Sequence, residues 1–225
     1  MTEVKKIVFL GASTAFYEVS EIIHIINLKQ KTYEIIAILD DNIEMHGKLM
    51  RGVKVEGALT LASNYTDAYF VFGIGSMKTR LIRQEILNKI NIDESRFVSI
   101  IHPSAVIDRS VNIENGCIIH PGVCIGNNVI IDSFAIIAVN TAIGPYAYIG
   151  KFAMITSLVA VLSSVKIGKS VFIGSCSCIT ENIEIGNGSM IGAGTVVSRN
   201  IDKGCFFLGN PGRLISRIEL PKDHQ

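Results

Sequence analysis

The chain has 225 residues with a formal net charge of +1, and its 48% hydrophobic and 18% charged residues indicate a packed protein, not a disordered one. Its length allows one large domain or two small ones. The balanced charge, without long basic or acidic runs, excludes a nucleic-acid-binding surface, and no stretch approaches the roughly 18 apolar residues of a membrane span. The apolar run from Ile7 to Leu10 is too short for a signal peptide.

The first hundred residues alternate between short apolar runs and amphipathic stretches, which predicts a small α/β domain with a parallel sheet. In chain order, we first expect a strand from Lys5 to Leu10, a turn at 11–13 and a helix from Val19 to Leu28. Two strands follow, from Tyr33 to Leu39 and from Ala68 to Phe72. We then expect a helix that contains Leu81, Ile82, Ile86 and Leu87, and a last strand from Phe97 to Ile101.

Three strand ends in this domain carry residues suited to a ligand, because ligands bind such sheets at the carboxyl ends of the strands. The candidates are Ser13 and Thr14 after the first strand, Asp40 and Asp41 after the second, and Gly75 and Ser76 after the third. Ser76 is a candidate N-cap, a helix start offers backbone N–H groups to a phosphate, and a carboxylate can accept ribose hydroxyls. The sequence lacks a full GxGxxG, so NAD is not expected, and ordinary turn and cap roles remain open for all six residues.

An aliphatic residue stands at every sixth position from Ile107 to Val197, and the residue two places earlier in each hexad is small or aliphatic. A period of two inside each hexad points two side chains inward from a short strand. Three strands would form a triangular coil, and stacked coils bury a continuous core that a single coil cannot. Glycine often follows the inward isoleucine, as at Gly126, Gly144 and Gly150, and we expect it to let the chain turn at the corners.

This pattern resembles the hexapeptide-repeat acyltransferases, whose fold is a left-handed parallel β-helix. The further motifs GAST, LDD, GIGS, IHPSAVI and GNPGRLI resemble the sialic acid O-acetyltransferase/nucleotide-sugar N-acetyltransferase family over nearly the whole chain. The resemblance implies a Rossmann-like nucleotide-sugar-binding domain at 1–102, a β-helix acyltransferase domain at 103–215 and a polar tail at 216–225. It also implies a cytoplasmic homotrimer that serves surface-glycan synthesis.

The resemblance further implies where two substrates bind. The six residues at the strand ends would contact a nucleotide-linked amino sugar, and residues near Met154, Ser175 and Ala193 would line a groove for acetyl-CoA, the co-substrate. No metal site is expected, since no His, Cys and Asp set has ligand spacing. The five cysteines are an odd number without a CxxC pair, which favours a reducing compartment and small apolar packing roles.

The histidine that serves as the family's catalytic base is missing. In the hexad register its position is Pro145, and a second family histidine is replaced by Met154. Weak substitutes are His120, which should lie on a different corner, Tyr146, and Asn140. We therefore leave the catalytic residue open.

Three functions remain compatible with this sequence. The first is an acyl-CoA-dependent N-acetyltransferase of a nucleotide-linked amino sugar, since a partly neutral amine needs a base less than a hydroxyl does. The second is a sugar or sialic acid O-acetyltransferase with a relocated base. The third is a catalytically inactive β-helical binding or scaffold trimer.

Overall fold

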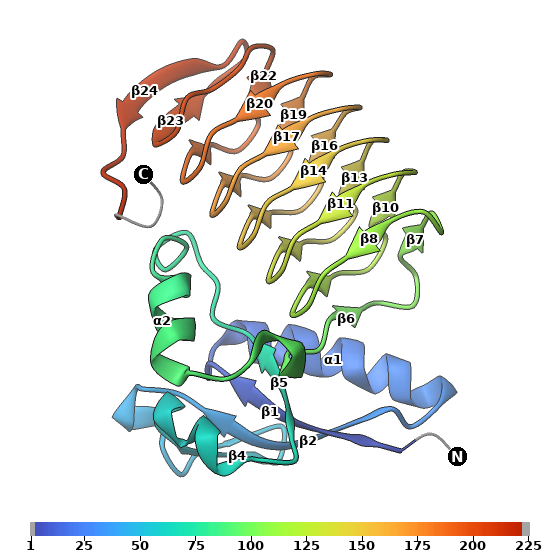
Figure 1. Cartoon of the computed structure of the whole chain (residues 1–225), viewed down its shortest axis with the longest axis vertical. Coiled ribbons are helices and arrows are strands. Elements are labelled where there is room, and N and C mark those ends of the chain that lie inside the picture. The colour runs from blue at the N-terminus through green and yellow to red at the C-terminus, as the bar shows by residue number, and fades with distance from the viewer. Residues whose placement is uncertain (1–2, 222–225) are drawn as a thin grey trace. The chain divides into compact units, whose positions relative to one another are not determined.

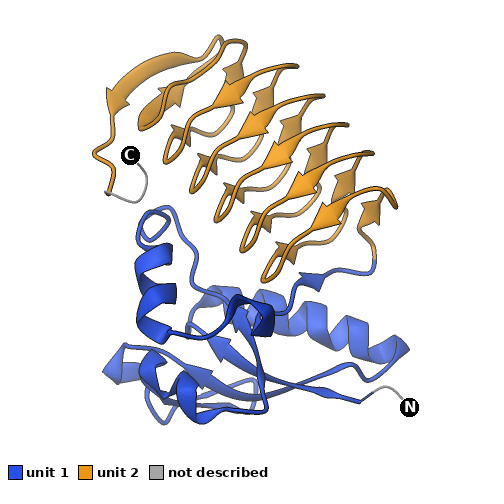
Figure 2. Cartoon of the chain, viewed as in Figure 1, with its two compact units in different colours: residues 1–103 blue, residues 104–225 orange. Residues whose placement is uncertain are grey.

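The computed structural model describes residues 3–221 of the chain (Figure 1). It divides into two compact units, residues 1–103 and 104–225 (Figure 2). In the described part, no helix is long and apolar enough to cross a membrane.

The first unit is built around a sheet of five strands in the order β3-β4-β2-β1-β5. Strands β1, β2, β4 and β5 pair in parallel, whereas β3 and β4 form an antiparallel hairpin. The elements of this unit are β1 (Lys5–Leu10), α1 (Thr14–Lys29), β2 (Tyr33–Leu39), η1 (Ile43–Met45), β3 (Leu49–Met50), β4 (Val53–Gly57), η2 (Leu59–Asn64), β5 (Tyr69–Phe72), α2 (Arg83–Ile90), η3 (Glu94–Arg96) and β6 (Ile100–Ile101).

The predicted strands β1 and β2 are confirmed with their boundaries, and the predicted parallel sheet is confirmed with the addition of the antiparallel β3–β4 hairpin at one edge, which was not predicted. The hairpin arises because Arg51 and Gly52 both have positive φ, which is the two-residue turn that matches the twist of paired strands. The last strand is shorter than predicted: β6 covers Ile100–Ile101, and Phe97 forms an isolated bridge with Phe70.

Both helices also begin elsewhere than predicted. Helix α1 begins at Thr14 instead of Val19, because Ser13 caps its first turn. Helix α2 begins at Arg83, so Leu81 and Ile82 belong to the turn that precedes it. Apolar periodicity shows the buried face of a helix but not its first turn, which local hydrogen bonds decide.

The second unit is a parallel β-helix of three strand stacks. One stack has the order β22-β19-β16-β13-β10-β7, another β20-β17-β14-β11-β8, and the third runs from β9 through β12, β15, β18 and β21 to β23 and β24. The strands are β7 (Val106–Ile107), β8 (Asn112–Ile113), β9 (Ile118–Ile119), β10 (Cys124–Ile125), β11 (Ile130–Ile131), β12 (Ile136–Ile137), β13 (Ala142–Ile143), β14 (Tyr148–Ile149), β15 (Met154–Ile155), β16 (Ala160–Val161), β17 (Lys166–Ile167), β18 (Phe172–Ile173), β19 (Cys178–Ile179), β20 (Glu184–Ile185), β21 (Met190–Ile191), β22 (Val196–Val197), β23 (Cys205–Leu208) and β24 (Arg213–Arg217).

The stacking register is the one that the hexads predict. Ile125 pairs with Ile143, which in turn is followed in the stack by Val161 and Ile179. The inward aliphatics are buried from Ile119 onward, whereas Ile107 and Ile113 in the first coil stay partly exposed. The first two residues of the predicted polar tail belong to β24, and residues 222–225 lie outside the described part.

The corner glycines have a different role from the one predicted. In most coils the positive φ angle falls three residues after the inward aliphatic, at non-glycine residues such as Asn128, Tyr146 and Phe152 and, in other coils, at a glycine such as Gly194. The glycine directly after the isoleucine is needed for space instead: a Cβ on Gly150 would lie 2.7 Å from the carbonyl carbon of Gly168 in the next coil. Each strained corner is held by a hydrogen bond between coils, such as Tyr146 N to Asn127 O at 3.0 Å.

Candidate active site

The carboxyl ends of β1, β2 and β5 lie next to one another in the first unit. The amide of Gly11 donates to the carbonyl of Leu39 at 2.8 Å, and the amide of Gly73 donates to Leu10 at 2.9 Å. The two turns are in direct contact, since a Cβ added to Gly11 would lie 2.9 Å from Cγ1 of Ile74. The structure therefore brings the three predicted segments to one edge of the sheet.

Ser13 and Thr14 lie at the start of α1, where both are exposed. The Ser13 hydroxyl accepts a hydrogen bond from the amide of Ala15 at 3.3 Å, so this side chain caps the helix. A capped helix start still presents its first amide groups and the positive end of the helix dipole to an anion. The local geometry is compatible with the predicted phosphate contact.

Asp40 and Asp41 both hold backbone around this edge. Asp40 accepts the amide of Ala12 at 2.6 Å and the amide of Asn42 at 2.7 Å, one on each carboxylate oxygen. Because a carboxylate has about four acceptor sites, Asp40 retains capacity for a ligand hydroxyl.

Asp41 is bound on both oxygens as well. It accepts the amide of Leu59 at 3.0 Å and forms an ion pair with Lys89 of α2 at 2.8 Å. The hydrogen bond from Lys89 lowers the pKa of Asp41 below its usual value. Sequence reasoning missed Lys89, because nothing local in the sequence links it to a carboxylate 48 residues away.

Gly75 and Ser76 lie in the segment that follows β5, but Ser76 does not cap α2 as predicted. Its hydroxyl accepts the amide of Thr79 at 3.1 Å, and its own amide donates to the Thr79 hydroxyl at 3.0 Å. This reciprocal pair closes a separate turn before the helix, whose N-cap position is Ile82. The prediction of Ser76 as a helix cap is therefore wrong.

The three residues expected near acetyl-CoA follow one edge of the β-helix. Met154 lies on β15 and is 7% exposed. Two residues on, Thr156 accepts a hydrogen bond from the Ser175 hydroxyl at 3.1 Å. Ala193 stands one coil above Ser175, and the amide of Gly194 donates to the Ser175 carbonyl at 2.8 Å. Ala193 is exposed and Ser175 is half-buried, so this edge is open beside the last coils.

Pro145 lies at a corner between the stack of β13 and the stack of β14. Its carbonyl accepts the amide of Ser164, and the following residue, Tyr146, is 62% exposed. Asn140 has a positive φ at the corner between β12 and β13, where it occupies the position that Tyr146 occupies at the corner after β13. Neither residue brings an imidazole or carboxylate to Pro145.

His120 lies on a different corner from Pro145, as predicted from the register. Its amide donates to the carbonyl of Ile137 at 3.0 Å, which places it in the column below Ala138. It is 8% exposed and therefore is not a solvated histidine. Within residues 3–221, no cluster of three His, Cys, Asp or Glu side chains has the geometry to hold a metal ion.

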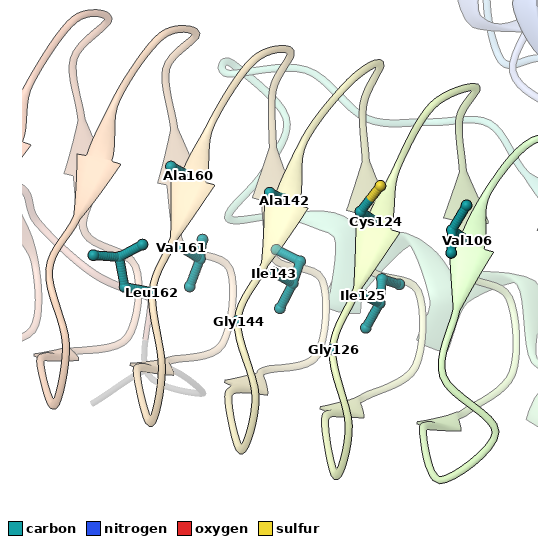
Figure 3. Close-up of a pocket in the computed structure, with 10 residues that line it drawn as sticks. All are labelled: Val106, Cys124, Ile125, Gly126, Ala142, Ile143, Gly144, Ala160, Val161 and Leu162. Carbon is teal, nitrogen blue, oxygen red and sulfur yellow. The ribbon is translucent and has the colours of Figure 1, made fainter.

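A shallow apolar groove of about 300 Å³ runs along the stack of β7, β10, β13 and β16. Figure 3 shows the outward side chains of Val106, Cys124, Ala142 and Ala160 in one row, one from each coil. The rest of the lining consists of Ile125, Ile143, Val161, Leu162 and the two glycines Gly126 and Gly144. A Cβ on Gly126 would lie 3.0 Å from the ring of Pro145, so the groove borders this proline.

Two protein-family models match the chain. Residues 6–90 match the PglD N-terminal domain, and residues 164–199 match the bacterial transferase hexapeptide repeat, described as six repeats. One match therefore lies in each of the two units of the chain. The hexapeptide-repeat assignment from the sequence is thereby confirmed. None of the curated proteins matches this hexapeptide-repeat chain by sequence.

Solved structures share its fold from end to end. A mutant of perosamine N-acetyltransferase from Caulobacter crescentus, in complex with CoA and GDP-perosamine, has a TM-score of 0.80 at 23% identity, covering 95% of this chain and 98% of that one. The acetyltransferase domain of PglB from Neisseria gonorrhoeae FA1090 has a TM-score of 0.78 at 21% identity, with 94% and 100% covered. WeeI from Acinetobacter baumannii AYE has a TM-score of 0.77 at 22% identity, with the same coverage. These likenesses confirm the predicted fold of an α/β unit followed by a β-helix.

Proposed function

We propose that this protein is an acetyl-CoA-dependent N-acetyltransferase that acts on a nucleotide-linked amino sugar for surface-glycan synthesis. One observation carries the proposal: a PglD N-terminal domain and hexapeptide repeats occur in one chain whose fold matches, over 95% of its length, a perosamine N-acetyltransferase solved with CoA and GDP-perosamine. In this proposal the first unit holds the nucleotide and the β-helix holds acetyl-CoA.

The contacts within each unit support this division of roles. In the first unit, the start of α1 at Ser13 and the carboxylate of Asp40 lie at one sheet edge, where phosphate and ribose can be bound. In the second unit, the open edge at Ser175 and Ala193 presents small side chains and backbone on successive coils, which suits an extended pantetheine arm.

The chemistry at Pro145 favours an amine acceptor over a hydroxyl. Acyl transfer needs a neutral nucleophile that is positioned against the thioester. An amine with a pKa near 8 is about a tenth neutral at pH 7, so it can attack without a base and lose its proton to water afterwards. A sugar hydroxyl is not ionised near neutral pH and depends on a base, which contributes typically ~10²–10⁴-fold. A proline at the base position is therefore less costly for amide formation than for ester formation.

We also propose that the protein assembles as a homotrimer through the groove of Figure 3. The outward row of this stack consists of Val106, Cys124, Ala142, Ala160, Cys178 and Val196, which carry no charge and are small. Small apolar side chains in a straight row let a second copy approach closely and exclude water from the row. Light scattering should give the mass of three chains, and Ala142→Arg, which puts a charge into the row, should give a smaller species.

We place the protein in the cytoplasm. All five cysteines are free, and Cys124 and Cys176 are exposed. Exposed thiols persist best in a reducing compartment, where acetyl-CoA is also available.

The proposal is tested by calorimetric titration with acetyl-CoA and with a panel of UDP-, GDP- and dTDP-linked amino sugars, followed by mass spectrometry of the reaction products. Binding of both ligands and an amide product are expected. A folded protein that binds neither acetyl-CoA nor any nucleotide sugar would leave the scaffold alternative standing instead.

A further inference from the structure

The turn between β5 and α2 contains a buried arginine whose charge has no partner. Arg80 is only 8% exposed. Its Nη1 donates to the carbonyl of Met77 at 2.8 Å, whereas Nε reaches no acceptor. Among the residues that the structure describes, none offers a carboxylate to this guanidinium, and burial alone lowers its pKa. A buried cation in this state costs free energy unless an anion compensates it.

The position of Arg80 connects it to the proposed nucleotide edge. The hydrogen bond to Met77 holds the guanidinium against the turn that Ser76 and Thr79 close. That turn continues from Gly73 and Ile74, which are in contact with the Gly11 turn before α1. The arginine therefore belongs to the same set of strand-end segments as the start of α1.

We propose that Arg80 is the cation that binds the diphosphate of the nucleotide sugar. The guanidinium is planar and presents its N–H groups as a fixed fork, which suits two phosphate oxygens better than an ammonium does. The carbonyl of Met77 accepts a hydrogen bond from Nη1 alone, and Nε has no partner in the described part of the chain. A phosphate could therefore accept hydrogen bonds from the guanidinium and neutralise the charge of Arg80. This inference rests on the proposed function and adds to it the residue that recognises the diphosphate.

The test compares wild-type protein with Arg80→Gln and Arg80→Lys by calorimetric titration with UDP, GDP and dTDP, with the corresponding nucleosides, and with acetyl-CoA. Arg51→Gln is the matched control. Arg51 lies in the turn of the β3–β4 hairpin, where it is exposed and forms an ion pair with Glu21 of α1. Arg80→Gln should weaken nucleoside diphosphate binding by at least about tenfold. Arg80→Lys should lose less, and the nucleosides, acetyl-CoA and the control variant should show wild-type affinities.

Thermal unfolding separates ligand binding from a structural role. Removal of an unpaired buried charge should leave the unliganded melting temperature unchanged or higher, while UDP should stabilise wild type more than Arg80→Gln. Equal diphosphate affinities of wild type and Arg80→Gln would overturn the inference and leave the proposed function intact. A selective loss of acetyl-CoA binding in Arg80→Gln would also overturn the inference, because it would assign the Arg80 cation to the diphosphate of CoA. If wild type binds no nucleoside diphosphate at all, both the proposed function and the inference fail.

Discussion

Replacement of Gly150 by alanine tests the finding that the repeat glycines provide space between coils. The new Cβ would lie 2.7 Å from the carbonyl carbon of Gly168 and 2.8 Å from the carbonyl oxygen of Ile167. These atoms are backbone, so no flexible side chain can move away. Relaxation to an ordinary contact requires the two coils to separate by roughly 0.7 Å, which stretches the 2.8 Å hydrogen bond from Gly150 N to Ile167 O.

Overpacking costs about 1–3 kcal/mol, and a weakened backbone hydrogen bond adds about 1 kcal/mol. We expect Gly150→Ala to lower the free energy of unfolding by about 3 kcal/mol, which lowers the melting temperature by roughly 10 °C in a chain of this size.

The control is Gly194→Ala, since Gly194 has a φ of +68° but nothing within 4 Å of its added Cβ. That variant bears only the strain of a positive φ, about 1 kcal/mol. Circular dichroism melts at equal protein concentration compare the two. A Gly150→Ala melt equal to or above that of Gly194→Ala would refute the spacing argument.

Three further outcomes follow from the structure. Pro145→His should keep N-acetyl transfer and raise its rate near pH 7, where the imidazole is largely neutral and the acceptor amine largely protonated, as a pH profile would show; a loss of activity in a folded protein would mean that this corner serves the acceptor in another way. Ala193→Trp should weaken acetyl-CoA binding at least about tenfold in calorimetry and leave nucleotide binding unchanged; unchanged acetyl-CoA affinity would remove Ala193 from the proposed groove. Asp41→Asn should cost less than about 1 kcal/mol at pH 7, because the ion pair with Lys89 is half-exposed and screened by solvent. Since that pair lowers the folded-state pKa, its contribution is present above the unfolded pKa of about 3.9 and disappears as the pH falls through the folded value, which urea unfolding at a series of pH values would detect.

The architecture of the β-helix was predictable because the same hexad pattern of inward residues repeats along the chain. An inward residue at every sixth position is sufficient to define strand, register and stack, and Ile125, Ile143 and Val161 lie where that period requires. The role of the glycines was not predictable. A sequence shows that Gly150 lacks a side chain, but not whether the backbone angle or the neighbouring coil demands it.

The site was partly predictable for the same reason. Residues at the ends of parallel strands must share one edge of a sheet, so Ser13, Asp40 and Ser76 could be grouped from the sequence. The ion pair of Lys89 with Asp41 and the burial of Arg80 could not be predicted, because both basic residues occur in ordinary polar stretches. Their roles depend on burial and on contacts that arise only when the chain folds.

The most direct test of the proposed function is transfer of the acetyl group from acetyl-CoA to a nucleotide-linked amino sugar, measured by release of free CoA thiol and by mass spectrometry of the product. We expect an amide product and a rate that rises with pH as the acceptor amine loses its proton. An ester product, or a folded protein that releases no CoA with any amino sugar of the panel, would contradict it.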